Sequence, residues 1–347
     1  MDVTQIMRSW LQGNFDRARQ LYAYYGSSLF IGYGERFRID MELELAHYRL
    51  CAELLKDAGD PHEPGYQMRR ARLLYLTGDL AGADAIIAKT GFQYADRIGL
   101  HLSNTRALIL LQRGEYVEAA AQFQQKLKTP RKPNAKTEEP ETILALNGLA
   151  LAQLGAHDLD SASDSAMRAL HLSTSSWGES SIPALDSMLT LARIRTEQHD
   201  FDEARRLLET CSQGRRKIYE TYNPKVAEIL EVTSKLEMLG GEPTEAVHHA
   251  ALALDVRQEL AIGENPWPEQ KLKSRDAPCT ARGYWPARAL LVQANAYAAA
   301  ANYDMAEKCL DNAIPTLEAA LGKDAPVVQQ ARKRRNSLPP APVAINP

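Results

Sequence analysis

Apolar and polar positions along the chain alternate with the period of amphipathic helices. The stretch 36–57 is one example, with apolar residues three or four positions apart on one predicted helical face: Ile39, Leu43, Ala46, Leu50 and Leu54. Ala and Leu dominate the apolar residues, whereas Val and Ile are sparse, and this balance favours helices over strands. The pattern therefore predicts an all-α chain in which 36–57 forms one long helix.

One short phrase recurs along the chain: a turn residue, a polar residue, an apolar residue, two variable residues and then Ala. The marker alanines of the seven copies are Ala18, Ala83, Ala119, Ala162, Ala204, Ala246 and Ala306. Twelve positions before the last six of them stands another small residue: Ala71, Ala107, Ala150, Ala192, Ser234 and Ala294. Small residues at both places allow two antiparallel helices to approach closely, so each phrase predicts a helical hairpin.

Turn and linker residues support the same division into hairpins. The turn residue is Gly in four copies, His157 and His199 in two, and Ala301 in the last, and an Asp, Asn or Glu follows it. Such pairs end one helix and start the next. Between later hairpins the linkers contain a proline, which suits the first turn of a new helix: Pro183, Pro224, Pro266 and Pro326.

The turn phrase, as in Gly114–Ala119, resembles that of the tetratricopeptide repeat. Three consecutive spacings between marker alanines are 43, 42 and 42 residues, and the linker Asn223–Ala227 reads Asn-Pro-Lys-Val-Ala. Both features resemble the 42-residue variant found in kinesin light chains. The resemblance implies an α-solenoid, a right-handed superhelix of about seven helix–turn–helix repeats, with the extra N-terminal helix placed before the array.

We divide the chain into three parts on these grounds. Residues 1–60 are predicted to be a degenerate capping repeat plus the long helix, and 61–330 the repeat array. An irregular insertion at 264–283 interrupts the array, and it is either a surface excursion or a loop that folds across the groove. Residues 331–347 are predicted to be a basic and then Pro-rich disordered tail.

The basic run at 332–335 precedes Ser337, which makes Ser337 a candidate phosphorylation site. The same run also fits the solvated basic end of a last helix, or a nuclear-import signal. The sequence does not decide among these three interpretations.

The resemblance also implies which residues line the concave face of the superhelix. Groove positions counted from the upstream small residues give a predicted binding surface: Arg72, Tyr75, His101, Asn104, Leu108, Asn147, Leu151, Arg193, Lys235 and Asn295. Asn104 and Asn147 occupy the same position in consecutive repeats and resemble asparagines that hold a peptide main chain, because an amide both donates and accepts. Arg72 and Arg193 share another position, from which they could bind carboxylates. Alternatively, these polar residues are solvated, or the asparagines hold neighbouring helices together.

Charge and motif searches narrow the function classes. The net charge of −3 over 347 residues gives no reason to expect nucleic acid, and no apolar run approaches the roughly 20 residues of a membrane span. Cys51, Cys211, Cys279 and Cys309 form no metal-type pair, which favours free thiols and, with no secretory signal, a cytoplasmic location. No phosphate loop, zinc-protease or nucleophile motif occurs, so we expect no catalytic site, cofactor or metal.

The sequence therefore predicts a non-catalytic scaffold or adaptor that binds a peptide or protein segment in its concave groove, alone or within a larger complex. One alternative is a regulatory protein whose array changes curvature when a ligand or peptide binds. Another is an enzyme or enzyme subunit on a helical-repeat scaffold, because catalytic groups can converge from distant repeats. The identity of the partner does not follow from these residues.

Overall fold

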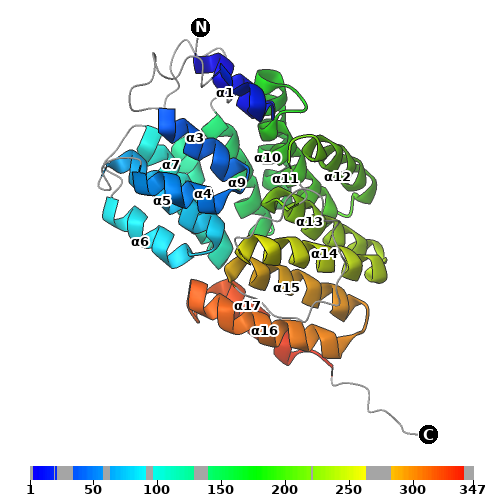
Figure 1. The fold of residues 1–347 in the computed structure, drawn as a ribbon. Coiled ribbons are helices and arrows are strands. Elements are labelled where there is room, and N and C mark those ends of the chain that lie inside the picture. The colour runs from blue at the N-terminus through cyan, green and yellow to red at the C-terminus, as the bar shows by residue number, and fades with distance from the viewer. Residues whose placement is uncertain are drawn as a thin grey trace, which may run out of the picture.

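The computed structural model describes residues 3–18, 20–21, 34–57, 63–90, 97–128, 140–219, 222–262 and 283–339. Over these ranges the chain forms helices and no strand, and consecutive helices pack as antiparallel pairs (Figure 1). The first four labelled helices are α1 (Val3–Leu11), α3 (Gly34–Glu44), α4 (Tyr48–Asp57) and α5 (Pro64–Thr77). The next six are α6 (Leu80–Thr90), α7 (Arg97–Arg113), α8 (Tyr116–Leu127), α9 (Pro140–Gly155), α10 (Leu159–Trp177) and α11 (Ile182–Glu197). The last six are α12 (Phe201–Arg216), α13 (Pro224–Gly240), α14 (Pro243–Ile262), α15 (Tyr284–Ala299), α16 (Tyr303–Leu321) and α17 (Pro326–Asn336).

The turn inside every hairpin uses the left-handed backbone conformation. The seven predicted turn residues all have positive φ: Gly13 (74°), Gly78 (91°), Gly114 (85°), His157 (63°), His199 (61°), Gly241 (86°) and Ala301 (56°). That conformation lets the chain reverse after a helix C-terminus. In several copies the next residue then caps the following helix, as Asp158 does by accepting from the Ser161 amide at 3.2 Å. His157 and His199 are turn residues, as the sequence pattern indicated.

Small residues at the helix crossings bring the two helices of each hairpin together. The seven marker alanines are fully buried, and so are most of the small residues twelve positions upstream. At the α8–α9 crossing, a Cβ on Gly148 would come within 2.2 Å of the Phe123 ring, so only glycine fits there. These crossings confirm the predicted all-α solenoid of paired helices.

The linkers between hairpins behave as the prolines indicated. Pro183, Pro224 and Pro326 lie in the first turns of α11, α13 and α17. Ser181 and Asn223 cap two of these helices through side-chain oxygens that accept amide hydrogen bonds. Pro266 lies outside the described residues.

The N-terminal part differs from the expected single long helix. The stretch 36–57 forms two helices, α3 and α4, because the chain turns at Ala46 with φ of 64°. At the other end, α17 continues to Asn336, so the basic run 332–335 is the last turn of a helix. The predicted insertion over 264–283, except Gly283, and the Pro-rich residues 340–347 lie outside the described part of the chain.

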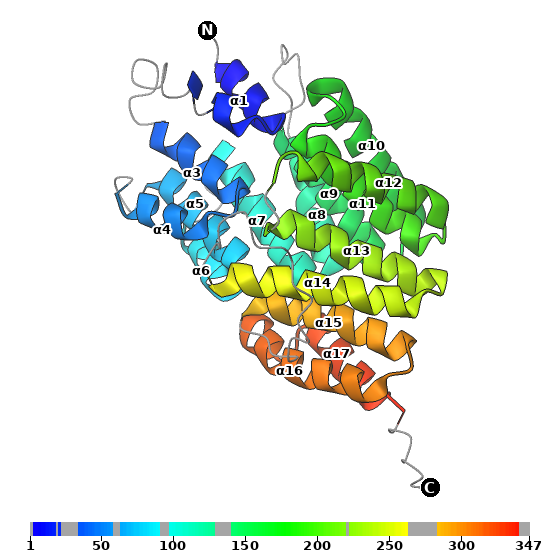
Figure 2. The same ribbon diagram turned by 45° about the vertical axis from the view of Figure 1, so that its right-hand side comes forward.

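The array curves until its last hairpins meet its first ones. A single cluster of buried apolar side chains combines α5–α7 with α15–α17, and Figure 2 shows the last group below α6 and α7. Tyr284 at the start of α15 donates from its hydroxyl to Gln112 Oε1 at 2.9 Å, and the Trp285 indole donates to the Tyr75 carbonyl at 3.2 Å. We call this junction, formed by Tyr75, Gln112, Tyr284, Trp285 and the cluster around them, the apolar seam.

A second junction links the N-terminal helices to the middle of the array. The Tyr219 hydroxyl, after α12, donates to Glu44 Oε1 at 2.6 Å, and Asn223 Nδ2 donates to the Glu44 carbonyl at 3.4 Å. Glu44 also pairs with Arg72 on α5 at 3.6 Å. We call Glu44, Arg72, Tyr219 and Asn223 the polar seam. The two seams together turn the groove into a central cavity that remains partly open.

Cys51, Cys211 and Cys309 are buried, and Cys279 lies outside the described residues. Among the described helices, none is long and apolar enough to cross a membrane.

Candidate functional site

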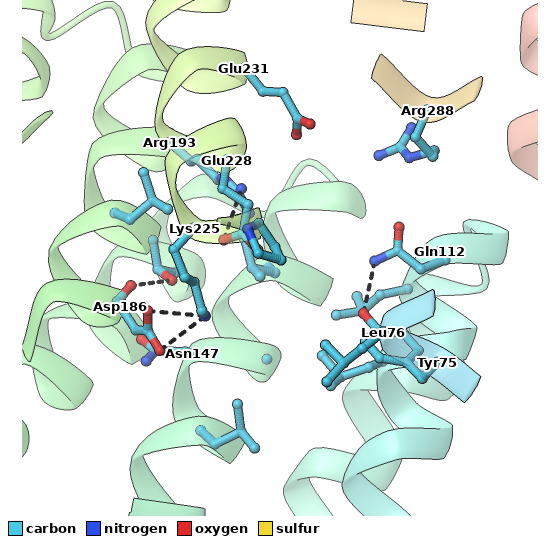
Figure 3. Close-up of a pocket in the computed structure, with 18 of the residues that line it drawn as sticks. Tyr75, Leu76, Gln112, Asn147, Asp186, Arg193, Lys225, Glu228, Glu231 and Arg288 are labelled. Carbon is cyan, nitrogen blue, oxygen red and sulfur yellow. Dashed lines mark hydrogen bonds and ion pairs between the residues drawn. The ribbon is translucent and has the colours of Figure 1, made fainter. Parts of the chain in front are cut away.

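The central cavity is a large hollow in the described structure. It encloses about 1400 Å³ and is lined by the first helix of each hairpin, α5, α7, α9, α11, α13 and α15, with α3 and α4 at one side. Figure 3 shows polar and charged side chains on two facing walls, with Asp186 and Lys225 on one and Tyr75 and Gln112 on the other. Each hairpin therefore contributes one wall helix to the cavity.

The position of each residue within its repeat predicted much of this cavity wall. Nine of the ten predicted groove residues line the cavity: Arg72, Tyr75, Asn104, Leu108, Asn147, Leu151, Arg193, Lys235 and Asn295. The side chain of the tenth, His101, lies outside the described ones. Their common position follows from the repeat period, because equivalent positions of stacked hairpins face the same side of a superhelix. A role of these residues in binding stays a prediction.

The paired asparagines are buried and incompletely hydrogen-bonded. Asn104 on α7 is 3% exposed and Asn147 on α9 is 6% exposed, yet both line the cavity. Within the described part of the chain, Asn104 Nδ2 has no hydrogen-bond partner, and neither has Asn147 Oδ1. A buried amide group without a partner costs free energy, so this part of the wall offers one free donor and one free acceptor.

The orientation of the Asn147 amide is fixed by its neighbours. Asn147 Nδ2 donates to Ser187 Oγ on α11 at 3.1 Å. The Ser187 hydroxyl in turn donates to the Pro183 carbonyl at 2.9 Å, so its oxygen is left to accept from Asn147. The amide therefore both holds neighbouring repeats together, as the alternative interpretation expected, and keeps Oδ1 unpartnered.

The two groove arginines have partners within the chain. Arg72 pairs with Glu44 at 3.6 Å, and Arg193 pairs with Glu228 on α13 at 3.8 Å. Lys235 likewise pairs with Glu197. These three cations are compensated by the protein's own carboxylates, which weakens the expectation that the arginines await a ligand. Counting positions along the repeats could have predicted that Glu228 pairs with Arg193, since Glu228 lies at a groove position of the next repeat.

A buried ion-pair network that the sequence did not indicate lies beside them. Arg215 on α12 is 1% exposed and donates to Asp186 at 2.6 Å, and Lys225 donates to the same carboxylate at 3.2 Å. Burial would lower the pKa of Arg215 and of Lys225, but the surrounding acidic groups, Asp186 foremost and Glu228 with it, together outweigh burial and raise both pKa values. Arg215 belongs to the second helix of its hairpin, so groove counting could not find it.

Glu228 belongs to the same network. Burial would raise the pKa of its carboxyl, but the surrounding cations, Lys225 and Arg193 foremost, outweigh burial and lower the pKa to about 2. Glu228 and Lys225 are thus both charged at neutral pH.

An aromatic group forms the opposite part of the wall. Tyr75 and Trp285 pack edge to face with ring centroids 5.6 Å apart. The Arg257 guanidinium lies over the Trp285 ring at 5.0 Å and pairs with Glu231 at 3.0 Å. Burial raises the pKa of Tyr75 to about 12, so its hydroxyl stays protonated. Over the described residues, no group of three or more His, Cys, Asp and Glu side chains could hold a metal ion. This part of the wall offers hydrogen bonds and apolar contacts.

Comparisons with known proteins agree with this architecture. A family model described as tetratricopeptide repeat matches residues 184–259. The solved structure of a Rap protein complexed with competence and sporulation factor is similar with a TM-score of 0.59 and 12% identity, covering 88% of this chain and 80% of that one. No curated protein sequence matches the chain.

Two further solved structures are more distant in shape. BtubC from P. vanneervenii has a TM-score of 0.42 and 16% identity, covering 80% of this chain and 92% of that one. A putative kinesin light chain from Podospora anserina with nearly identical repeats has a TM-score of 0.42 and 19% identity, covering 63% and 94%. The family model covers α11 to α14, so this part of the chain is similar to tetratricopeptide repeats, and helices paired in the same way continue on both sides of it.

Proposed function

We propose that this protein is a non-catalytic adaptor whose central cavity binds an extended peptide segment of a partner protein. The observation that carries the proposal is the asparagine pair. Asn104 and Asn147 stand at equivalent positions of adjacent wall helices, almost fully buried, with an unpartnered donor on one and an unpartnered acceptor on the other. An extended peptide presents a carbonyl and an N–H at every residue, so it can satisfy both.

The rest of the wall suits a peptide as well. Apolar side chains such as Leu108, Leu151 and Leu189 alternate with polar ones around the cavity. This mixture provides contacts for side chains and for the main chain of a bound segment. The Rap structure supports the proposal, because that protein has the same fold over 88% of this chain and was solved with a bound factor.

The test uses a defined probe. A library of random nonapeptides, acetylated at the N-terminus and amidated at the C-terminus, is selected on the wild-type protein, and the enriched peptides are measured by fluorescence polarisation. The double variant Asn104→Ala/Asn147→Ala loses two hydrogen bonds between buried amides and the peptide. It should therefore bind the enriched peptides at least roughly tenfold more weakly than wild type. Asn312→Ala is the matched control, since Asn312 is exposed on α16 and donates only to the Lys308 carbonyl.

Circular dichroism separates binding from folding in this experiment. The double variant should keep its helical signal, because it leaves the apolar hairpin cores unchanged and removes one hydrogen bond between repeats, from Asn147 to Ser187. The proposal is wrong if no peptide is enriched, or if the folded double variant binds the enriched peptides within about twofold of wild type.

The polar seam favours a second candidate function, a sensor whose curvature changes on binding. Arg72 belongs both to the cavity wall and to the polar seam through its ion pair with Glu44. A ligand that competes for Arg72 would loosen this junction. Small-angle X-ray scattering with and without an enriched peptide distinguishes the functions, because a sensor changes its radius of gyration and a rigid adaptor does not.

A further inference from the structure

We propose that Ser337, at the end of α17, is a phosphorylation site for a protein kinase that recognises basic residues before its target. The inference goes beyond peptide binding and does not depend on it. In the reaction, the Ser337 hydroxyl oxygen attacks the terminal phosphorus of a nucleoside triphosphate. A phosphorus–oxygen bond to Ser337 forms, the bond to the bridging oxygen breaks and releases the diphosphate, and the hydroxyl proton passes to a base of the kinase.

The position of Ser337 makes its hydroxyl accessible. α17 packs on α16 at the C-terminal edge of the array (Figure 1), and Ser337 caps it as an exposed residue. The Ser337 amide donates to the Lys333 and Arg334 carbonyls, both at 3.1 Å, and its hydroxyl donates to the Arg334 carbonyl at 2.9 Å. Helix ends open at low cost. A kinase that binds an extended segment therefore has to break only the bonds of the last turn and the packing of half-buried Leu338.

Two cations beside Ser337 lack an ionic partner. In the basic run 332–335, Arg332 and Arg335 pair with carboxylates of α16 at 2.6 and 3.0 Å. Over the described residues, Lys333 and Arg334 form no ion pair. Ser337 follows Lys333 by four positions and Arg334 by three, so the three residues are neighbours on the last turn of the helix. No other serine or threonine of the described chain has cations at both of these spacings.

The same two cations suit the modified side chain. A phosphoserine has nearly two negative charges and three acceptor oxygens at neutral pH. The helix dipole disfavours an anion at a C-terminus, so the phosphate needs nearby cations for compensation. Lys333 and Arg334 can supply it without giving up another ion pair. We therefore expect them first to bind acidic residues of the kinase and then to pair with the phosphate.

Thr210 on α12 provides a comparison within the same chain. It is exposed and follows Arg206 by four positions, but Arg206 already pairs with Glu203 at 2.7 Å. Thr210 also lies well inside α12, where its hydroxyl donates to the Arg206 carbonyl at 3.0 Å. It has neither the free cations nor the helix end of Ser337, so we expect no phosphate there.

The first experiment incubates the full chain with magnesium, ATP and the catalytic subunit of cyclic-AMP-dependent protein kinase, and maps phosphorylated peptides by mass spectrometry. We expect phosphate on Ser337 and none on Thr210. Arg334→Gln removes a charge-assisted contact with the kinase and should slow phosphorylation of Ser337 roughly tenfold or more. Circular dichroism should show an unchanged helical signal, since Arg334 forms no ion pair within the described chain.

The second experiment tests the pairing in the product. Phosphorus NMR of the phosphorylated protein, recorded against pH, gives the second pKa of the phosphate, which is ordinarily about 6. Adjacent cations favour the dianion, so this pKa should lie below 6 despite the helix dipole. Lys333→Gln keeps Arg334 for the kinase and should move the pKa back up. A modification that merely occupied an exposed helix end would not respond to Lys333.

Three results would overturn the inference. If Ser337 acquires no phosphate, or Thr210 acquires as much, the helix end and its free cations do not define a site. Phosphorylation of Arg334→Gln at the wild-type rate would show that the basic run is not recognised. A second pKa of 6 or above that ignores Lys333→Gln would contradict the pairing. None of these results concerns Asn104 and Asn147, so the proposed function stands or falls separately.

Discussion

The apolar seam and the polar seam close the same array with different chemistry. The apolar seam continues the hydrophobic core, so side chains from α5–α7 and α15–α17 form one buried cluster. The polar seam depends on Glu44, which accepts from Tyr219 at 2.6 Å and pairs with Arg72. Burial of apolar area is non-directional and large, whereas a hydrogen bond to a charged group contributes less and requires alignment. We therefore expect opening of the polar seam to require less free energy than opening of the apolar seam.

The largest expected effect comes from overpacking the apolar seam. Gly78 has φ of 91°, and a Cβ there would lie 3.0 Å from Tyr284 Cβ. Gly78→Ala should lower the free energy of unfolding by roughly 2–4 kcal/mol, from left-handed strain plus overpacking. Urea unfolding followed by circular dichroism measures it.

The matched control for this variant is Gly241→Ala. Gly241 has φ of 86° at an equivalent turn, with nothing within 4 Å of its Cβ position. It should therefore show the strain alone, roughly 1–2 kcal/mol. Equal losses in the two variants would show that the apolar seam does not contribute to stability.

A smaller effect is expected from the polar seam. Tyr219→Phe removes the hydrogen bond to Glu44 and keeps the ring that packs near Phe15 at 6.4 Å. The free energy of unfolding should fall by about 1.5 kcal/mol. Hydrogen exchange of amides in α3 and α4 should quicken, while exchange in α15 stays unchanged. Faster exchange in α15 as well would mean that the two seams open together.

A pH-dependent effect is expected from acid titration of the network near the polar seam. The pKa of Glu228 is about 2 in the fold against an ordinary value of 4.5. A lowered pKa stabilises the fold above pH 4.5, and this contribution is lost as the pH falls toward 2. Wild type should therefore exceed Glu228→Gln in stability above pH 5, and the difference should shrink toward pH 2. A constant difference over that range would contradict the shift.

Local features of the fold could be predicted from the sequence because local residues determine them. The turn at His157 and the cap at Asp158 depend on a few neighbouring positions. The same local pattern recurs in each repeat, which made it easier to recognise. The N-terminal helices show the limit of this approach. Ala46 fits the apolar face of a continuous helix by spacing, yet it adopts φ of 64° and ends α3.

Long-range features were not predictable in the same way. The contact between Trp285 and Tyr75 depends on the twist added by every intervening hairpin, and a small change in each crossing angle would separate the two ends. The candidate site was only partly predictable, because it combines positions set by the repeat period with contacts between distant parts of the chain. Register placed Asn104 and Asn147 on the wall, whereas Glu44, the partner of Arg72, reaches the site through the unpredicted break at Ala46.

Closure of the array also limits how this protein can change in length. An open solenoid can gain or lose a hairpin at little cost, because each repeat contacts only its neighbours. Here an added hairpin would carry α15 past Tyr75 and Gln112, and a deleted one would leave it short of them. The number of repeats is therefore fixed by geometry, as it is in a ring of subunits.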